Sequence, residues 1–128
     1  MLSELKILKM TNDIKLLTDE LSEKKATDIL VVDLGQPHHL LMDYVIIVSV
    51  SNTIHLRSLA DYMQRFHKKN KADQLHDVDE MVVSGASDSG WIILDLNTIV
   101  LHLMTADTRL YYDFDDVFSS YDQYRYHA

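Results

Sequence analysis

The sequence contains no cysteine, a single proline and three glycines. Without cysteine the chain has no disulfides and no cysteine-based zinc site. With only three glycines, Gly35, Gly85 and Gly90, the chain shows no Gly-rich phosphate-binding loop. No apolar run approaches the roughly 18 residues that span a bilayer, and the charged N-terminus lacks the apolar core of a signal peptide. We therefore expect a cytoplasmic protein that does not bind membranes.

Positive charge is also scarce. The chain has 12 lysines and arginines against 20 aspartates and glutamates, so its formal net charge is −8. Nucleic-acid affinity comes mainly from neutralising phosphates, and the short run Lys68-Lys69-Asn70-Lys71 is too small to supply it. Little direct binding of RNA or DNA is therefore expected. A basic protein partner, in contrast, would be steered towards this acidic surface.

The length of 128 residues fits a single domain. We assign residues 1–120 to that domain, with an N-terminal helix within residues 1–25, and expect residues 121–128 to be a flexible tail. Apolar residues recur at steps of three and four along the N-terminal helix, which makes one stripe. This stripe faces either the protein's own core or a dimer interface. Its members are Ile7, Met10, Ile14, Leu17 and Leu21.

The rest of the chain alternates between strand and helix patterns. Continuous apolar runs predict buried strands over residues 29–34 and 44–50, the first closed by Gly35-Gln36-Pro37. The polar run Ser51-Asn52-Thr53 favours a helix N-cap, and the helix that follows ends near Lys71. Shorter strands are expected over residues 80–84, 91–96 and 98–104, and a last helix starts near Thr105. Strand–helix–strand order predicts a crossover with partly parallel pairing.

A hairpin is expected at Leu96-Asn97, because Asn tolerates the positive φ of a tight turn. This register pairs Trp91 with His102. One face of the hairpin is the natural core side, with Ile92, Leu94, Ile99, Leu101 and Leu103. The opposite face is too apolar for ordinary solvated surface, so either a helix of the same chain or another protein covers it. That face carries Trp91, Ile93, Val100, His102 and Met104.

The sequence shows no arrangement of residues typical of an enzyme. Seven histidines are present, but none has the HExxH spacing that places two zinc ligands on one helix face. Asp113, Asp115 and Asp116 lack the glycine and the spacing of a calcium loop. Ser49 and Ser51 have no recognisable base partner. We therefore expect no catalytic residues, no metal site and no cofactor. The histidines are His38, His39, His55, His67, His76, His102 and His127.

Several short motifs, in a specific order and spacing, resemble one family. They are ATDILVVDL at 26–34, MDYVIIVSVSNTIHLRSLAD at 42–61 and WIILDLNTIVLHLM at 91–104, followed by Arg109-Leu110-Tyr111. The most specific parts are Asp43-Tyr44, Leu59-Ala60-Asp61 and the Trp91…Asp95…His102 pattern. Together they resemble the ribosomal silencing factor RsfS, also called the Iojap family, from about Leu16 to Phe118.

The resemblance implies a fold and a function. The implied fold is an α/β (α+β) single domain, with a mixed sheet of about five strands flanked by helices and a nucleotidyltransferase-like topology without the catalytic residues. Family members bind the large ribosomal subunit through the ribosomal protein numbered fourteen in its series. They block joining of the small subunit and lower translation when nutrients are scarce. The partner-binding residues carried over by motif are Tyr44, Trp91, Leu94, Asp95, His102, Met104 and Arg109, with Ser51 and Tyr111.

The chain also departs from the family pattern. The usual Ser-Gly-Thr-Ser after the second strand is Ser49-Val50-Ser51-Asn52, and Ile54 replaces a common arginine. The usual Glu-Gly before the loop is Ser84-Gly85. The usual Asp-x-Gly-Asp turn is Asp95-Leu96-Asn97-Thr98, where Asn can adopt the φ of the missing Gly. These changes remove polar groups, so they affect the contacts with the ribosomal partner and the affinity for it.

Two alternatives to silencing remain open at this stage. The first is a factor that assists assembly of the large subunit, which would use the same docking face. The second is a nucleotidyltransferase-like enzyme, which would need a Gly-Ser loop and two acidic residues alternating on a strand to hold metal ions. Val50-Ser51 and Asp95-Leu96-Asn97 do not supply these features. We also expect a homodimer of the free protein, in which the docking face is occluded.

Overall fold

The computed structural model describes residues 4–35, 44–73 and 81–127. They form a single α+β domain around an open, mixed sheet of six strands in the order β3-β4-β5-β2-β1-β6. The pairing of β2 with β5 is parallel and the other four pairings are antiparallel. The strands are β1 (Thr27–Asp33), β2 (Tyr44–Val50), β3 (Val82–Ala86), β4 (Trp91–Asp95), β5 (Ile99–Thr105) and β6 (Asp122–Arg125).

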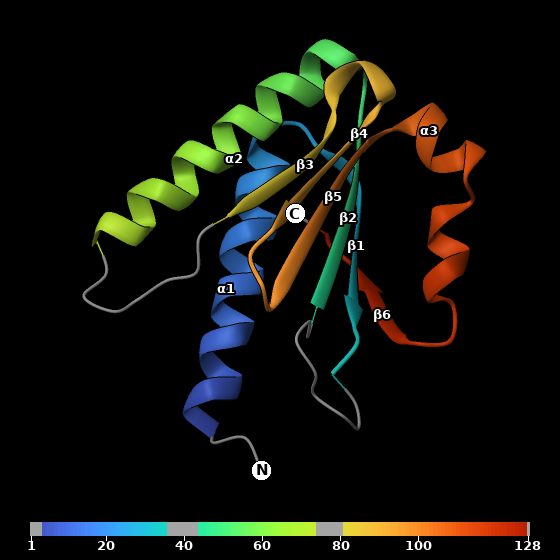
Figure 1. Ribbon diagram of the computed structural model, residues 1–128. Coiled ribbons are helices and arrows are strands. Elements are labelled where there is room, and N and C mark those ends of the chain that lie inside the picture. The colour runs from blue at the N-terminus through green and yellow to red at the C-terminus, as the bar shows by residue number, and fades with distance from the viewer. Residues whose placement is uncertain (1–3, 36–43, 74–80, 128) are drawn as a thin grey trace.

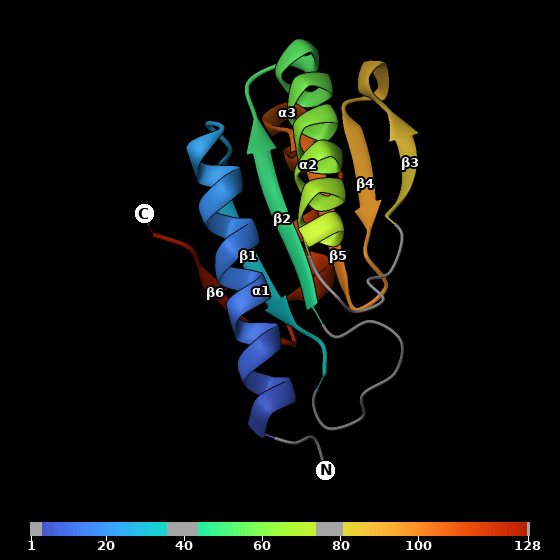
Figure 2. The ribbon, with the colours of Figure 1, turned by 90° about the vertical axis from the view of Figure 1, so that its left-hand side faces the viewer.

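Two long helices cover one face of this sheet, and they lie next to each other on it (Figure 2). These are α1 (Glu4–Glu23) and α2 (Thr53–Asp73). The α2 helix begins as expected, because the side chain of Asn52 accepts a hydrogen bond from the His55 N–H at 2.8 Å. Among the described residues, no helix has the length and apolar content needed to cross a membrane.

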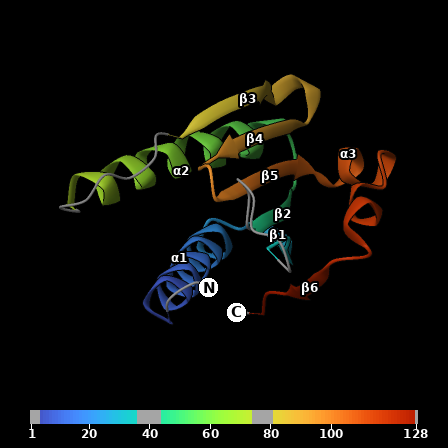
Figure 3. The ribbon, with the colours of Figure 1, turned by 60° about the horizontal axis from the view of Figure 1, so that its bottom comes forward.

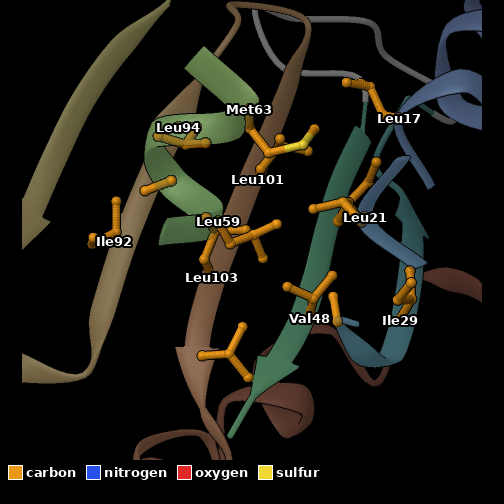
Figure 4. Packing of buried hydrophobic residues seen from close by; sticks show 14 of the residues in the cluster. Leu17, Leu21, Ile29, Val48, Leu59, Met63, Ile92, Leu94, Leu101 and Leu103 are labelled. Atoms are coloured by element: carbon orange, nitrogen blue, oxygen red, sulfur yellow. The ribbon is translucent and has the colours of Figure 1, made fainter. Parts of the chain in front are cut away.

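The main core lies between these helices and the sheet (Figure 4). The predicted stripe on α1 faces this core at Ile14, Leu17 and Leu21, each no more than 7% exposed. The side chains of Ile7 and Met10 lie outside the described residues. A fully buried aliphatic side chain stabilises the fold by roughly 1.5–3 kcal/mol. The helices are therefore held on the sheet chiefly by the apolar side chains of this core. Strands and α2 contribute Val48, Leu56, Leu59, Met63, Leu94, Leu101 and Leu103.

The opposite face of the sheet is covered by a different part of the chain (Figures 1 and 3). This segment comprises the short helix α3 (Ala106–Tyr111) and the 3-10 helix η2 (Phe114–Phe118). The side chain of Thr105 caps α3 by accepting a hydrogen bond from the Thr108 N–H. A smaller apolar cluster fills the space below the segment, and it includes Leu30, Val32, Val45, Ile47 and Met104.

The sheet has six strands rather than the five expected, because the C-terminal tail forms β6. Residues 121–128 were predicted to be flexible, yet Asp122–Arg125 pairs with β1 along its whole length. Every residue of β6 is exposed, so its sequence carries no apolar strand pattern. The strand is held by backbone pairing and by Tyr126, whose N–H donates to the Ile29 carbonyl at 2.9 Å. Tyr126 also donates its hydroxyl to Asp19 of α1 at 2.5 Å.

The hairpin between β4 and β5 forms, but its register differs from the prediction by two residues. Trp91 pairs with Met104, and His102 pairs with Ile93. The turn residues are Asn97 and Thr98 rather than Leu96 and Asn97. Asn97 has φ 76°, and its N–H donates to the Asp95 carboxylate at 2.8 Å. Because side chains alternate along a strand, a shift of two residues changes the partners and leaves both faces unchanged.

Gly85→Ala should destabilise the domain by about 2–4 kcal/mol. Gly85 has φ 86°, and an added Cβ would lie 2.3 Å from the Trp91 carbonyl oxygen, a backbone atom of β4. Gly90→Ala is the matched control, because φ is similar at 81° but the nearest atom is the side-chain oxygen of Thr108. We expect the control to lose less stability in urea unfolding. Equal midpoints for Gly85→Ala and the unmodified protein would contradict the described path of β3.

Candidate functional site

The apolar hairpin face carries a cluster of aromatic rings around Trp91, the only tryptophan in the chain. Trp91 is half-buried, and its ring centroid lies 5.0 Å from that of Phe114 and 5.6 Å from that of Tyr112. His102 packs 4.7 Å from Phe114 and 5.9 Å from Trp91. We call these four residues, Trp91, His102, Tyr112 and Phe114, the aromatic cluster. It combines two strands with the segment after α3.

His102 fixes the polar edge of the indole. Nε1–H of Trp91 donates to Nδ1 of His102 at 3.1 Å. An indole nitrogen can only donate, so Nδ1 of His102 must be unprotonated and the proton of the neutral ring is on Nε2. Burial lowers the pKa of His102 from its ordinary value of 6.5 to about 4, against an opposing effect of the Asp95 carboxylate. The ring is therefore neutral at pH 7 and can accept this bond.

The α3–η2 segment is held in place by Arg109. Its guanidinium makes two parallel hydrogen bonds to the Asp115 carboxylate, at 2.8 and 2.9 Å. It also donates to the Asp28 carbonyl at 2.7 Å and to the Ser49 hydroxyl at 3.0 Å. The hydrogen bonds from Arg109 to Asp115 are the main cause that lowers the pKa of Asp115, against the opposing effect of its partial burial, and the charges of Arg109 and Arg125 add to the lowering. Arg109 thereby joins α3, η2, β1 and β2, and Phe114 is carried by the segment that it fixes.

Exposed apolar and acidic side chains lie on the same α3–η2 segment as Tyr112 and Phe114 of the aromatic cluster. Tyr111 is 81% exposed and packs edge-on against Tyr112, which is 56% exposed. Leu110 is 80% exposed on the same short helix. The carboxylates of the segment other than Asp115 are exposed to solvent, and they are Asp107, Asp113 and Asp116. A segment that exposes both apolar and acidic side chains suits a partner surface with apolar and basic groups.

Three of the predicted partner-binding residues are internal. Leu94 and Met104 are both 0% exposed, so neither can contact a partner in this conformation. Leu94 faces the helices, because it alternates with Trp91 and Asp95 along β4. Met104 lies on the same face as Trp91 but is covered by the smaller apolar cluster. Arg109 is 7% exposed and makes the four hydrogen bonds described above, so it lies beneath the surface in this conformation.

Tyr44, Asp95 and Ser51 do not join the aromatic cluster. Tyr44 lies beside Ile99 on the helix-covered face, next to a cavity of about 310 Å³ that Asp33 and Tyr124 also line. Asp95 shares the face of Trp91 but lies at the far end of β4, where it binds the turn. Ser51 follows β2 and is exposed. Trp91, His102 and Tyr111 are thus the predicted residues that the fold brings together.

Ser51 has a histidine partner that the sequence analysis overlooked. Its hydroxyl lies 3.1 Å from Nδ1 of His55, and its N–H donates to the same nitrogen at 3.2 Å. Nε2 of His55 lies 2.9 Å from the Lys24 carbonyl oxygen, to which it donates. The spacing of four residues across a helix N-cap was a visible signal. The arrangement ties the start of α2 to the end of α1.

Two members of the aromatic cluster, Tyr112 and Phe114, were absent from the predicted site. Asp113 between them has φ 47°, which ends α3 and turns the chain so that Phe114 packs on the indole. The available signal was the aromatic-rich run at 111–118, of which only Tyr111 was carried over by motif. Within the described ranges, no three His, Asp or Glu side chains lie close enough together to hold a metal ion.

Comparison with known proteins gives a consistent result. The family model described as "Ribosomal silencing factor during starvation" matches residues 8–127. The chain is 29% identical over 108 residues to the mouse "Mitochondrial assembly of ribosomal large subunit protein 1", covering 84% of this chain and 45% of that protein. It is 26% identical over 93 residues to the ribosomal silencing factor RsfS of Bacillus subtilis, covering 73% of each.

Solved structures agree on the fold. A protein of Chromobacterium violaceum has a TM-score of 0.70 at 24% identity, with 84% of each chain covered. A protein of Bacillus halodurans has a TM-score of 0.63 at 19% identity, with 84% of this chain and 93% of that chain covered. At this identity the two structures support the arrangement of helices and strands, and the family match rests on sequence.

Proposed function

The chain belongs to the family of ribosomal silencing factors, and on this basis we propose that it is a non-enzymatic protein that binds the large ribosomal subunit and prevents the small subunit from joining. The match spans residues 8–127, which includes most of α1, the helices α2 and α3, and all six strands. Repression of translation when nutrients are scarce is the physiological role that follows, and the cytoplasm is the compartment in which we expect it.

The aromatic cluster is the observation that carries this proposal. A half-buried tryptophan surrounded by exposed tyrosines is the usual composition of an interface centre. Trp91 and Phe114 pack on the smaller apolar cluster, on the sheet face opposite α1 and α2. Figure 3 shows α3 on that side of the sheet. The rigidity of the aromatic cluster comes from strands β4 and β5 and from the Arg109 bonds, so little conformational entropy is lost on docking.

The partner we propose is a ribosomal protein, the one numbered fourteen of the large subunit, as the family resemblance implies. Its surface should offer an apolar depression for the indole and basic side chains for Asp107, Asp113 and Asp116. A net charge of −8 favours this encounter and disfavours binding to ribosomal RNA. The mechanism is steric, because the body of the domain then occupies space that the small subunit requires.

A role in large-subunit assembly is the second candidate. The likeness to the mouse mitochondrial assembly protein favours it, since that match covers 84% of this chain. The matched segment is 45% of the mouse protein, so that protein has further sequence with which to act. An assembly factor should bind incomplete large subunits more tightly than mature ones, whereas a silencing factor should bind mature subunits.

A homodimer of the free protein is compatible with the same surface. Two copies that buried their aromatic clusters against each other would shield this apolar area from water until a ribosomal partner replaced one copy. In this arrangement, dilution converts the dimer into free monomer, and addition of large subunits converts it into the bound monomer. Analytical ultracentrifugation of the free protein over a range of concentrations measures this equilibrium.

Added to purified subunits, the protein should co-sediment with large subunits and lower the fraction of joined ribosomes. The effect should saturate near one copy per large subunit, because a single surface is involved. Sucrose-gradient profiles of large and small subunits, mixed with increasing protein, measure both quantities. Albumin at the same concentration is the control for non-specific effects.

Two results of this experiment would contradict the proposal. One is normal subunit joining at a large excess of the protein. The other is co-sedimentation with small subunits alone, because the steric mechanism places the protein on the large subunit. Binding to large subunits without any effect on joining would instead favour the assembly role.

A further inference from the structure

We propose that His102 is a positioning residue: its Nδ1 holds the Trp91 indole in the orientation that docks, and the imidazole itself need not touch the partner. This inference rests on the proposed function, since it concerns the same surface. His102 was first assigned to the interface by sequence motif. The structure supports a different role, because the ring is half-buried and packs against both Trp91 and Phe114.

The geometry explains why the indole needs this partner. An indole has one polar hydrogen, and in the cluster it is bonded to His102 at 3.1 Å. Trp91 and His102 lie on one face of the hairpin. Trp91 pairs with Met104, two residues beyond His102, so the bond runs diagonally between the strands. Without an acceptor at this point, Nε1–H would have to turn towards solvent, and the ring would leave its contacts with Phe114 and Tyr112.

The same bond affects how the partner is bound. A partner that covers the indole removes water from its N–H, and an unpaired N–H in that position would oppose binding. Because His102 already accepts the hydrogen, Trp91 presents only apolar surface to the partner. Neutrality of the imidazole is part of this role, because a protonated Nδ1 could not accept. The neighbours on β2 and η2 are Ile47 and Phe114, and Asp95 of β4 is the charged group that acts on the ring.

A matched pair of substitutions separates positioning from direct contact. Asn is the closest substitute for Nδ1, because its side-chain oxygen can accept from the indole, whereas Leu has nearly the same shape and no acceptor. In the free protein, the single indole N–H signal in the proton NMR spectrum reports the bond directly. We expect His102→Leu to shift this signal and to speed its exchange with solvent, and His102→Asn to keep it near the original position.

Binding to purified large subunits is the second readout. We expect His102→Leu to weaken co-sedimentation about tenfold, as for a lost hydrogen bond, and His102→Asn to remain within about threefold. An unchanged indole signal in His102→Leu would overturn the proposal. So would a loss of binding in His102→Asn despite a restored signal, because the imidazole would then contact the partner directly. If the unmodified protein fails to bind large subunits, the proposed function fails, while the indole signal still decides whether His102 orients Trp91.

Discussion

Trp91→Ala should weaken binding to large ribosomal subunits by at least about 30-fold, the loss of roughly 2 kcal/mol that marks a central interface residue. The substitution removes the ring around which the aromatic cluster is built and leaves Phe114 and Tyr112 without their common contact. Because the indole is only half-buried, we expect the domain to lose about 2 kcal/mol of stability and to remain folded. Co-sedimentation measured by titration gives the affinity.

Two further variants make this prediction independent of folding. Ile54→Ala is the control, because Ile54 is equally apolar and 80% exposed but lies at the start of α2. It should bind like the unmodified protein. Tyr111→Ala changes an 81% exposed ring next to the cluster, so it should leave stability within about 0.5 kcal/mol and still weaken binding. Full binding by both Trp91→Ala and Tyr111→Ala would remove the aromatic cluster from the docking surface.

Arg109→Met should cost about 3 kcal/mol of unfolding free energy, the largest stability effect we expect from a single polar side chain here. The substitution keeps the aliphatic stem and removes four hydrogen bonds, to Asp115, Asp28 and Ser49. Asp115 would then lack its bidentate partner and η2 would lose its attachment to the sheet. For a domain of this size the melting temperature should fall by roughly 10–15 °C, which calorimetry measures.

Arg125→Met is the matched control for that experiment. Its guanidinium also approaches Asp115, at 3.5 Å, but its side chain is 48% exposed where that of Arg109 is 8% exposed. An exposed ion pair contributes less than about 1 kcal/mol because water screens it. We therefore expect Arg125→Met to lower the unfolding free energy only slightly. Equal losses from the two substitutions would mean that burial of Arg109 is not what fixes the α3–η2 segment.

The elements that the sequence predicted well are those in which apolar periodicity and burial coincide. Tyr44–Val50 was predicted over its full length, because a central strand is buried on both faces and reads as one apolar run. The stripe on α1 was correct at Ile14, Leu17 and Leu21, and both faces of the β4–β5 hairpin were correct, because apolar spacing coincides with burial there. The edge strand β6 was missed, because strands held by backbone pairing at an exposed edge need no particular side chains.

The candidate site was predictable only in part. Trp91 and His102 could be assigned to one surface, because side chains alternate along each strand of a hairpin. The two positions fall on the same face in the predicted register and also in the observed one. The roles of Arg109 and Phe114 could not be derived this way. They depend on a turn at Asp113 and on a bond from Arg109 to Asp115 that closes it. Contacts of this kind follow from backbone geometry, which residue spacing alone does not encode.

The aromatic cluster draws its rings from two stretches of sequence, which sets an order of events during synthesis. Trp91 and His102 leave the ribosome before Tyr112 and Phe114. Strand β1 can pair with β6 only after residues 122–125 have been made. Domains fold as units once their parts are available. A growing chain therefore has its indole in place before the surface around it is complete. On the proposed function, the docking surface is complete only after Tyr112, Phe114 and β6 have been made, so a nascent chain that still lacks these residues should not dock.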